Sequence, residues 1–390
     1  MVDNDRQSEL EGALAERIED LLTPALVIDL DAFDHNAAAI VQRVGDPSRW
    51  RPHVKTIKQA RLIKALMRKG VTQLKCATLD ELALALDTAE RVHPEGEVDA
   101  MLAYPVSKTV LRGVIALLGF YEGAEVRLVA DSPEHLAQLD GWLGELGGSS
   151  RLSVMLEVDT GMHRTGSSAE VWHAALDQIG GLANIALSGL HGYEGHVAWT
   201  DQETAFAGYD ALVGLANALP AKSVAHIVTS GSHGFVHALE HAGLGDGPWR
   251  HEVSPGTLVL SDLRSHAPAE ALQLHQAAFV ASRVVSHPGE GRVTLDAGSK
   301  AIAPDRPAPS SKVLGWANLE PLTPSEEHLP VRVKKGARPD RGAVVFLVPD
   351  HVCTTVNLYR KVIYVRGGEW IGIGEIEAMS RTLRLKDNRP

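Results

Sequence analysis

Apolar, β-prone segments recur along the chain from Trp50 onward, and helix-patterned stretches lie between them. The apolar segments lie at 51–56, 73–78, 99–105, 125–131, 151–159, 186–195, 223–232 and 251–260. Stretches such as Leu62–Lys69, Asp80–Thr88, Ser107–Leu118 and Pro133–Leu146 carry apolar residues at helical spacing. Such alternation implies parallel strands joined by crossover helices. Eight units predict a (β/α)8 barrel, which typically takes about 250 residues; the alternative is an open doubly wound sheet.

The pattern differs at both ends of the chain. Residues 1–22 predict a solvated helix, and residues 25–30 an apolar strand, after which Asp31 is expected to cap a helix that starts near Phe33. After Leu260, strands are predicted at 277–286, 291–296, 343–348 and 362–366, without long helices between them. We therefore divide the chain into an N-terminal helix (1–22), a barrel (23–265) and a mostly β domain (266–390). The strand at 25–30 could belong to the barrel or to the β domain.

The stretch Arg51–Thr56 holds the first candidate chemistry. If it is a strand, Arg51, His53 and Lys55 share one face. Lysine is almost never fully buried unless it is paired or used chemically. A desolvated amine is a good nucleophile toward a carbonyl, so Lys55 is a candidate Schiff-base lysine. A plain basic loop is the alternative.

Other reactive residue types follow the later predicted strands, where barrel enzymes place their active sites. Glu157 and Asp159 could be an acid/base pair, although we expect them to hold Arg164 or nearby backbone in place. Ser230-Gly231 and Gly256-Thr257 follow the seventh and eighth strands. Glycines and hydroxyls there suit a phosphate cradle, although many such runs are ordinary turns.

His351 and Cys353 stand two residues apart in the last domain. In a strand they would share one face, as two ligands of a metal do. The thiolate favours zinc over magnesium or calcium, and two protein ligands leave open positions that suit catalysis. A satisfied core histidine beside a small buried cysteine is the alternative.

Composition narrows the class of protein. Of 390 residues, 44% are hydrophobic and 22% charged, as in ordinary globular proteins. The net charge of -11 argues against nucleic acid or an anionic membrane as a partner. Two distant cysteines argue against a disulfide framework and favour a reduced, cytoplasmic setting. The polar, acidic N-terminus does not predict a signal peptide, and no apolar run has the length of a membrane span.

Taken together, these motifs resemble one enzyme family. They are Arg51-Pro-His-Val-Lys55-Thr, Glu157-Val-Asp-Thr-Gly-Met-His-Arg164-Thr-Gly166, Gly192-Tyr193-Glu-Gly-His196, the Ser230-Gly231 turn, Asp296-Ala-Gly-Ser-Lys300, Ser325-Glu-Glu-His328 and Pro349-Asp-His351-Val-Cys353. The chain resembles the D-threonine aldolase and eukaryotic-type D-serine dehydratase family of pyridoxal-phosphate enzymes, which have the alanine-racemase-like fold. The resemblance runs from about Thr23 to Arg381, nearly the whole chain.

The resemblance implies roles for individual residues. Lys55 would bind pyridoxal phosphate covalently, and His53, Arg164, Tyr193 and His196 would border the cofactor or the substrate. The phosphate would be held by Ser230, Gly231, Gly256 and Thr257. His351 and Cys353 would bind a divalent metal, either zinc, as in the dehydratases of the family, or manganese or magnesium, as in some of its aldolases. Family members of this fold are usually homodimers, and we expect one here.

One departure from the family pattern concerns the substrate. The family usually has Lys-Thr-His-Lys where this chain has Lys55-Thr-Ile57-Lys58. The missing imidazole leads to the hypothesis of a bulkier or more apolar substrate, or of a variant reaction.

The resemblance favours retro-aldol cleavage of D-3-hydroxy amino acids to glycine, or another amino acid, and an aldehyde. His196 is the candidate base for the hydroxyl proton. The alternative is a dehydratase, in which Lys55 removes the α-proton and a 2-oxo acid and ammonia form. A racemase and a non-enzymatic pyridoxal-phosphate carrier are less favoured, because neither needs the His351–Cys353 pair.

Overall fold

A computed structural model describes residues 2–93, 98–147 and 152–380. Parts of three predictions lie outside the described residues: Met1 of the N-terminal helix, Arg151 of the strand at 151–159, and residues 381–390 of the last domain. The chain forms two compact units. Unit 1 comprises residues 1–40 and 257–377, and unit 2 comprises residues 41–256 and 378–390. Among the described residues, no helix is both long and apolar enough to cross a bilayer.

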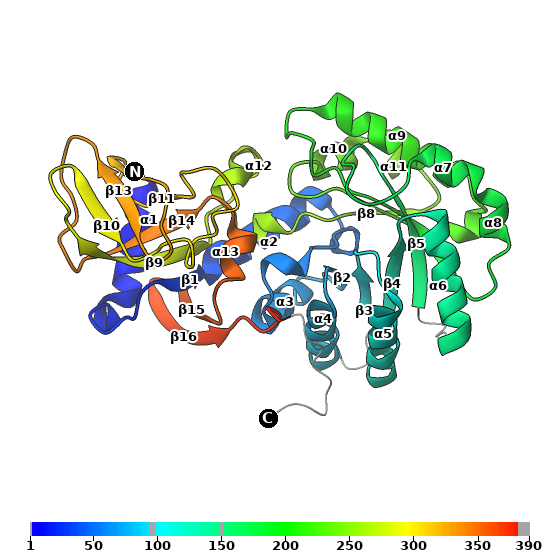
Figure 1. Cartoon of the computed structure of the whole chain (residues 1–390), viewed down its shortest axis with the longest axis horizontal. Helices are drawn as coiled ribbons and strands as arrows, with labels where there is room; N and C mark the ends of the chain where they lie inside the picture. Colours follow the sequence, from blue (N-terminus) through cyan, green and yellow to red (C-terminus); the bar gives the residue numbers. More distant parts are fainter. Residues whose placement is uncertain (1, 94–97, 148–151, 381–390) are drawn as a thin grey trace. The chain divides into compact units, whose positions relative to one another are not determined.

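Unit 2 is a parallel sheet whose strands follow one another in chain order (Figure 1). The strands are β2 (Gln73–Cys76), β3 (Val98–Leu102), β4 (Ala124–Ala130), β5 (Leu152–Val158), β6 (Leu187–Gly192), β7 (His226–Thr229) and β8 (Arg250–Val253). The helices are α3 (Ala60–Met67), α4 (Leu79–Val92), α5 (Lys108–Phe120), α6 (Pro133–Leu146), α7 (Ala169–Ala174), α8 (Leu176–Gly180), α9 (Gln202–Ala218), α10 (Phe235–Glu240) and α11 (Ala242–Gly245). The predicted alternation of strands and helices is confirmed.

The segment before α3 takes the place of an eighth strand. Trp50 pairs in parallel with Val253 of β8, and His53 pairs in parallel with Lys75 of β2. The segment therefore joins the two ends of the sheet, which supports the barrel over an open doubly wound sheet. The prediction of a regular strand at 51–56 is wrong, because residues Val54–Thr56 turn into a 3-10 helix, η3.

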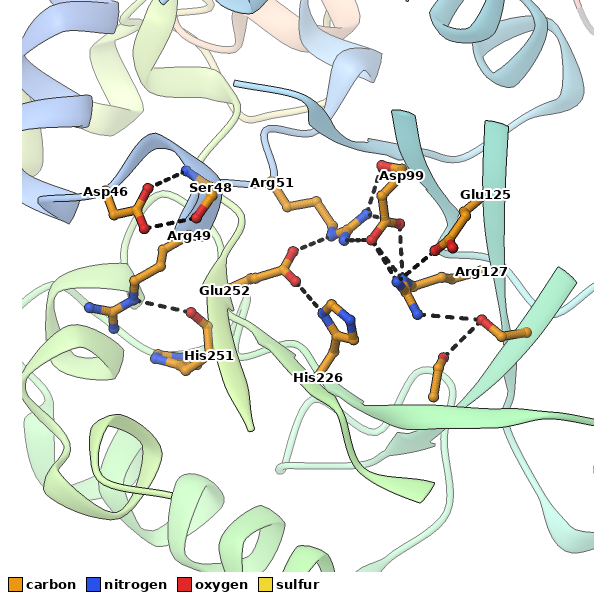
Figure 2. Close-up of polar contacts among 12 residues, drawn as sticks. Asp46, Ser48, Arg49, Arg51, Asp99, Glu125, Arg127, His226, His251 and Glu252 are labelled. Carbon is orange, nitrogen blue, oxygen red and sulfur yellow. Dashed lines mark hydrogen bonds and ion pairs between the residues drawn. The ribbon is translucent and has the colours of Figure 1, made fainter. Parts of the chain in front are cut away.

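Alternate residues of the barrel strands point inward and form layers. One layer is an ion-pair network (Figure 2). Arg51 donates to Glu252 at 2.6 Å and to Asp99 at 2.8 Å, and Arg127 also donates to Asp99. His226 Nδ1 lies 2.6 Å from the second oxygen of Glu252. An apolar layer of Met101, Val129, Met155 and Val228 follows two residues further along these strands.

Potential metal-ligand atoms of Asp99, His226 and Glu252 all lie within 4.8 Å of one another. The guanidinium groups of Arg51 and Arg127 already supply the positive charge that the two carboxylates need. Burial by itself would raise the pKa of Asp99, but the charge of Arg51 lowers it well below its usual range. We interpret this cluster as structural.

Unit 1 is built on a mixed, mostly antiparallel sheet of nine strands. Seven strands follow the order β12-β13-β10-β9-β1-β15-β16, and β14 pairs with both β9 and β11. Their bounds are β1 (Ala25–Asp29), β9 (Ala278–Ser286), β10 (Arg292–Leu295), β11 (Ser311–Val313), β12 (Leu319–Pro321), β13 (Leu329–Val333), β14 (Val344–Pro349), β15 (Lys361–Arg366) and β16 (Glu369–Glu375). Its short helices are α1 (Val2–Leu14), η1 (Ala15–Arg17), η5 (Thr257–Val259), η6 (Leu263–Ser265), α12 (His266–Ala271) and α13 (Val352–Val356). The predicted mostly β second domain is confirmed.

The strand at 25–29 belongs to unit 1, because it pairs with β9 and β15. Helix α2 (Leu30–Val44) follows directly, and its first turn is capped by Asp29, which accepts hydrogen bonds from the backbone N–H groups of Asp31 and Ala32. The prediction that Asp31 caps this helix is therefore wrong by two residues. The predicted N-terminal helix ends at Leu14 and continues only as the 3-10 turn η1.

Candidate active site

Lys55 lies in the middle of the η3 turn, at the start of unit 2. His53 caps this turn, because its Nδ1 accepts a hydrogen bond from the backbone N–H of Lys55 at 3.4 Å. Both side chains are half-buried. Burial and the charges of Lys55 and Lys75 lower the pKa of His53 well below its usual range, so its imidazole is neutral. The turn thus places a neutral histidine and a lysine together, as the sequence predicts, although not through a strand.

A second lysine lies inside the barrel, and sequence reasoning missed it. Lys75 is only 2% exposed, and its Nζ lies 2.8 Å from Nε2 of His191 on β6. His191 Nδ1 in turn lies 3.4 Å from Oε1 of Glu157 on β5. The available signal was a charged residue inside the predicted strand 73–78, at a position that alternation directs inward.

Burial and neighbouring charges set the protonation of His191, Lys75 and Glu157. Burial and the charge of Lys75 lower the pKa of His191 to about 4. Burial and the charge of Lys55 lower the pKa of Lys75 to about 7. Burial would raise the pKa of Glu157, but the nearby imidazole of His191, 3.4 Å away, leaves it lowered overall. The ionised Glu157 also accepts a hydrogen bond from Thr165 at 2.9 Å.

Tyr193 follows β6 and lies beside two cations. The guanidinium carbon of Arg164 is 4.9 Å from the centre of the Tyr193 ring, and Nζ of Lys75 is 5.8 Å from it. A Cβ atom on Gly231 would come within 2.9 Å of the same ring. Arg164, Tyr193 and Gly231 are therefore brought together, as the resemblance implies.

The turns after β7 and β8 fit an anion cradle. Ser230 is fully buried, its Oγ has no hydrogen-bond partner among the described residues, and its φ of 63° is unusual for a serine. Gly256 packs against His53 so closely that a Cβ atom would lie 2.8 Å from the backbone oxygen of His53. An unsatisfied buried hydroxyl beside a glycine turn suits a phosphate ligand. Thr257 belongs to unit 1, where its hydroxyl lies 3.3 Å from Sγ of Cys353.

The two carboxylates of the Glu157–Gly166 motif have separate tasks. Asp159 accepts hydrogen bonds from the backbone N–H groups of Gly161 and His163, both at 3.0 Å, and therefore shapes the turn. Glu157 reaches His191 and Thr165 instead. The expected role of holding backbone in place applies to Asp159.

Two further predicted residues lie in contrasting environments. His196 is exposed, and a Cβ atom on Gly161 would lie 3.0 Å from its Nε2. Ile57 is 2% exposed and ends the η3 turn. Glu194, two residues before His196, is buried. Burial raises its pKa to about 7 despite hydrogen bonds from Thr160 and Tyr209.

In unit 1, His351 and Cys353 do not lie on a strand, which corrects the prediction. His351 precedes α13 and Cys353 lies in its first turn. A hydrogen bond with Cys353 and the carboxylate of Asp305 raise the pKa of His351 to about 9. Burial would raise the pKa of the Cys353 thiol, but the hydrogen bond with His351 leaves it lowered. The side chains still meet, because the turn directs both the same way.

Asp305 completes this pair and was not predicted. Its Oδ2 lies 2.6 Å from Nδ1 of His351, and its Oδ1 accepts a hydrogen bond from Thr354 at 3.0 Å. Metal-binding histidines almost always donate their second ring N–H to such a carboxylate. The donor set of imidazole, thiolate and orienting carboxylate therefore fits a divalent metal.

Comparison with known proteins gives the family. The family model for the N-terminal domain of alanine racemase matches residues 28–260, more than half of the chain. The chain belongs to the alanine racemase N-terminal domain family. A second family model, described as a serine dehydratase domain, matches residues 277–365 of this family member.

Two relatives of known name align with nearly the whole chain. It is 29% identical over 381 residues to a D-threonine aldolase of Arthrobacter sp, covering 91% of this chain and 92% of that protein. It is 24% identical over 387 residues to a D-serine dehydratase of Schizosaccharomyces pombe, covering 91% of each. Among solved structures, D-threonine aldolase from Filomicrobium marinum superposes with a TM-score of 0.77 at 23% identity, covering 93% of this chain and 96% of that one. The resemblance inferred from the motifs is confirmed.

Proposed function

We propose that this chain is a pyridoxal-phosphate- and divalent-metal-dependent lyase that cleaves D-3-hydroxy amino acids by a retro-aldol reaction. The observation that carries the proposal is the His351–Cys353 pair with Asp305 at its imidazole, 2.6 Å away. A racemase or a non-enzymatic pyridoxal-phosphate carrier has no need of this donor set. The aldolases and dehydratases among the relatives support the same class.

Pyridoxal phosphate would be held by Lys55, with Ser230, Gly231, Gly256 and Thr257 around its phosphate. The buried Oγ of Ser230, which has no partner among the described residues, supports this assignment. When bound, this cofactor supplies an electron sink for negative charge at the α-carbon of an amino acid. His53, Arg164 and Tyr193 would orient its ring.

A divalent metal would be held by His351 and Cys353. When bound, it supplies Lewis acidity toward a β-hydroxyl group. The thiolate of Cys353 favours zinc, with manganese or magnesium as alternatives. Asp305, whose Oδ2 lies 2.6 Å from Nδ1 of His351, would hold the ring proton on that nitrogen and leave Nε2 as the ligand atom.

Proton transfer separates the two candidate reactions. In the aldolase, a base takes the hydroxyl proton of the substrate, and His196 is the proposed base because it is exposed. In the dehydratase, Lys55 takes the α-proton and the hydroxyl leaves as water. The aldolase is favoured because the D-threonine aldolase relative is 29% identical, against 24% for the D-serine dehydratase.

Product analysis tests the proposal. The purified protein is incubated with pyridoxal phosphate and zinc or manganese, and D-threonine, D-serine and D-phenylserine are offered in turn. Glycine plus an aldehyde establishes the aldolase, and a 2-oxo acid plus ammonia establishes the dehydratase. If neither product forms with any of the three substrates, the proposed reaction is wrong. We further propose that the protein works as a cytoplasmic homodimer, which sedimentation and fractionation would test.

A further inference from the structure

Lys75 has an unusual environment for a lysine. It projects from β2 into the barrel and is 2% exposed. Its Nζ has one polar side-chain contact among the described residues, the 2.8 Å contact with Nε2 of His191. No described carboxylate lies within ion-pair distance of it. A buried ammonium without a counter-charge is costly, so an amine in such a place loses its proton readily.

Several charged and titratable groups face this amine. They are Arg51, His53 and Lys55 from the segment before α3, Glu157 from β5, Arg164 from the loop after β5, His191 from β6, and Tyr193 and Glu194 from the loop after β6. The two carboxylates are engaged elsewhere: Glu157 with His191 and Thr165, and Glu194 with Thr160 and Tyr209.

The contacts form a chain from carboxylate to imidazole to amine. With its proton on Nδ1, facing Glu157 at 3.4 Å, His191 offers the lone pair of Nε2 to an N–H of Lys75. All three side chains stand on strands, which hold them more rigidly than loops would. The Lys75 amine, with a pKa of about 7, is therefore mostly neutral at pH 8.

We propose that Lys75 is an acid–base group of the pyridoxal phosphate pocket and takes up one proton when the anionic cofactor enters. The proton comes from solvent and bonds to the lone pair of Nζ, turning an amine into an ammonium. The new positive charge, 5.8 Å from the centre of the Tyr193 ring, offsets the negative charge of the cofactor. Lys75 thus acts through its own charge, and His191 and Tyr193 hold its amine in place. This inference rests on the proposed cofactor.

The test measures protons rather than turnover. Cofactor-free protein is titrated with pyridoxal 5′-phosphate by calorimetry at pH 8, in two buffers of different ionisation heat, which gives the number of protons taken up. Lys75→Met should take up fewer protons than the wild type, by a difference approaching about one proton per cofactor, since a group of pKa near 7 starts mostly neutral there. Lys75→Arg should show the same loss, because arginine is already charged. Lys222→Met, at an exposed lysine of η4 (Ala221–Ser223), should match the wild type.

The pH dependence of affinity gives a second readout. Between pH 7 and pH 9, the wild-type affinity should fall more steeply than that of Lys75→Arg, by up to about tenfold per pH unit. If Lys75→Met does not fold, Lys75→Arg carries the test in both measurements. Equal proton uptake by the wild type and Lys75→Arg, with the cofactor bound in both, overturns the inference and leaves the proposed function intact. No cofactor binding by the wild type overturns both.

Discussion

Asp305 accepts a hydrogen bond from Nδ1 of His351 across 2.6 Å, although the two residues lie 46 positions apart in the chain. The imidazole hydrogen-bonds Cys353 as well, so one histidine joins a thiolate and a carboxylate. The arrangement fixes both the ring orientation and the tautomer that a metal ligand requires. The proposed metal site therefore has an outer residue that is expected to tune its affinity.

Removing Asp305 should weaken metal binding without abolishing it. We expect Asp305→Asn to lower zinc affinity about 10–100-fold, the usual effect of losing such a partner. Cys353→Ala should leave almost no bound metal. Metal content after dialysis against a graded chelator, measured by mass spectrometry, gives both results. Thr354→Val removes only the hydroxyl that donates to Asp305 and should cause a smaller loss. Wild-type affinity in Asp305→Asn would show that Asp305 does not support the ligand.

Two lysines, Lys55 and Lys75, belong to the proposed cofactor site, and only one should carry the cofactor. Lys55 is half-buried on the η3 turn, whereas Lys75 is buried and hydrogen-bonded to His191. After reduction with borohydride, we expect peptide mapping to find the pyridoxal adduct on Lys55. Lys55→Ala should also lose the visible absorbance of bound pyridoxal phosphate, while Lys222→Met keeps it. An adduct on the Lys75 peptide would transfer the assignment to that residue.

The barrel interior depends on Arg51 for its charge balance. Its guanidinium contacts Glu252 and Asp99, and Arg51 and Glu252 are fully buried. Arg51→Met would leave the buried carboxylates of Asp99 and Glu252 without this counter-charge and should lower the free energy of unfolding by about 3–5 kcal/mol. Urea denaturation measures this loss. Arg332→Met, which breaks an exposed pair with Glu320, should cost about 1 kcal/mol or less. Similar losses in the two variants would contradict the role of the network.

Glu194 should make the stability of the cofactor-free protein pH-dependent. Burial raises its pKa in the folded state to about 7, from the usual 4.5. Its contribution is therefore fully present below pH 4.5 and is lost as the pH rises through 7. Glu194→Gln should remove about 2–3 kcal/mol of the difference in stability between pH 5 and pH 8. Urea midpoints at both pH values provide the measurement. Glu145→Gln, at an exposed glutamate paired with Lys108, should leave the slope unchanged; the same slope in Glu194→Gln would refute the assignment.

Local patterns along the chain predicted the alternating strands and helices of the barrel. Apolar segments located the start of each of these strands to within a few residues, because each strand buries a local run of side chains, but the predicted ends were less exact, since β8 stops at Val253. Turn glycines after β7 and β8 marked the candidate cradle of Ser230 and Gly231, since close approach to an anion needs small residues there. The predicted strands at 51–56 and around His351–Cys353 were wrong. A 3-10 turn and a helical turn also bring residues two or three apart into contact, so spacing alone could not choose between them.

By itself, the sequence determined which residue types follow each strand, and with them the candidate lysine, cradle and metal pair. Only the tertiary structure decided which distant side chains complete those groups. Lys75, His191 and Glu157 come from three strands, and Asp305 reaches His351 from a separate loop. Their pKa values depend on burial and on neighbours in space, because a charge interacts strongly only in a low-dielectric interior and at short range. Such neighbours have no fixed spacing along a chain.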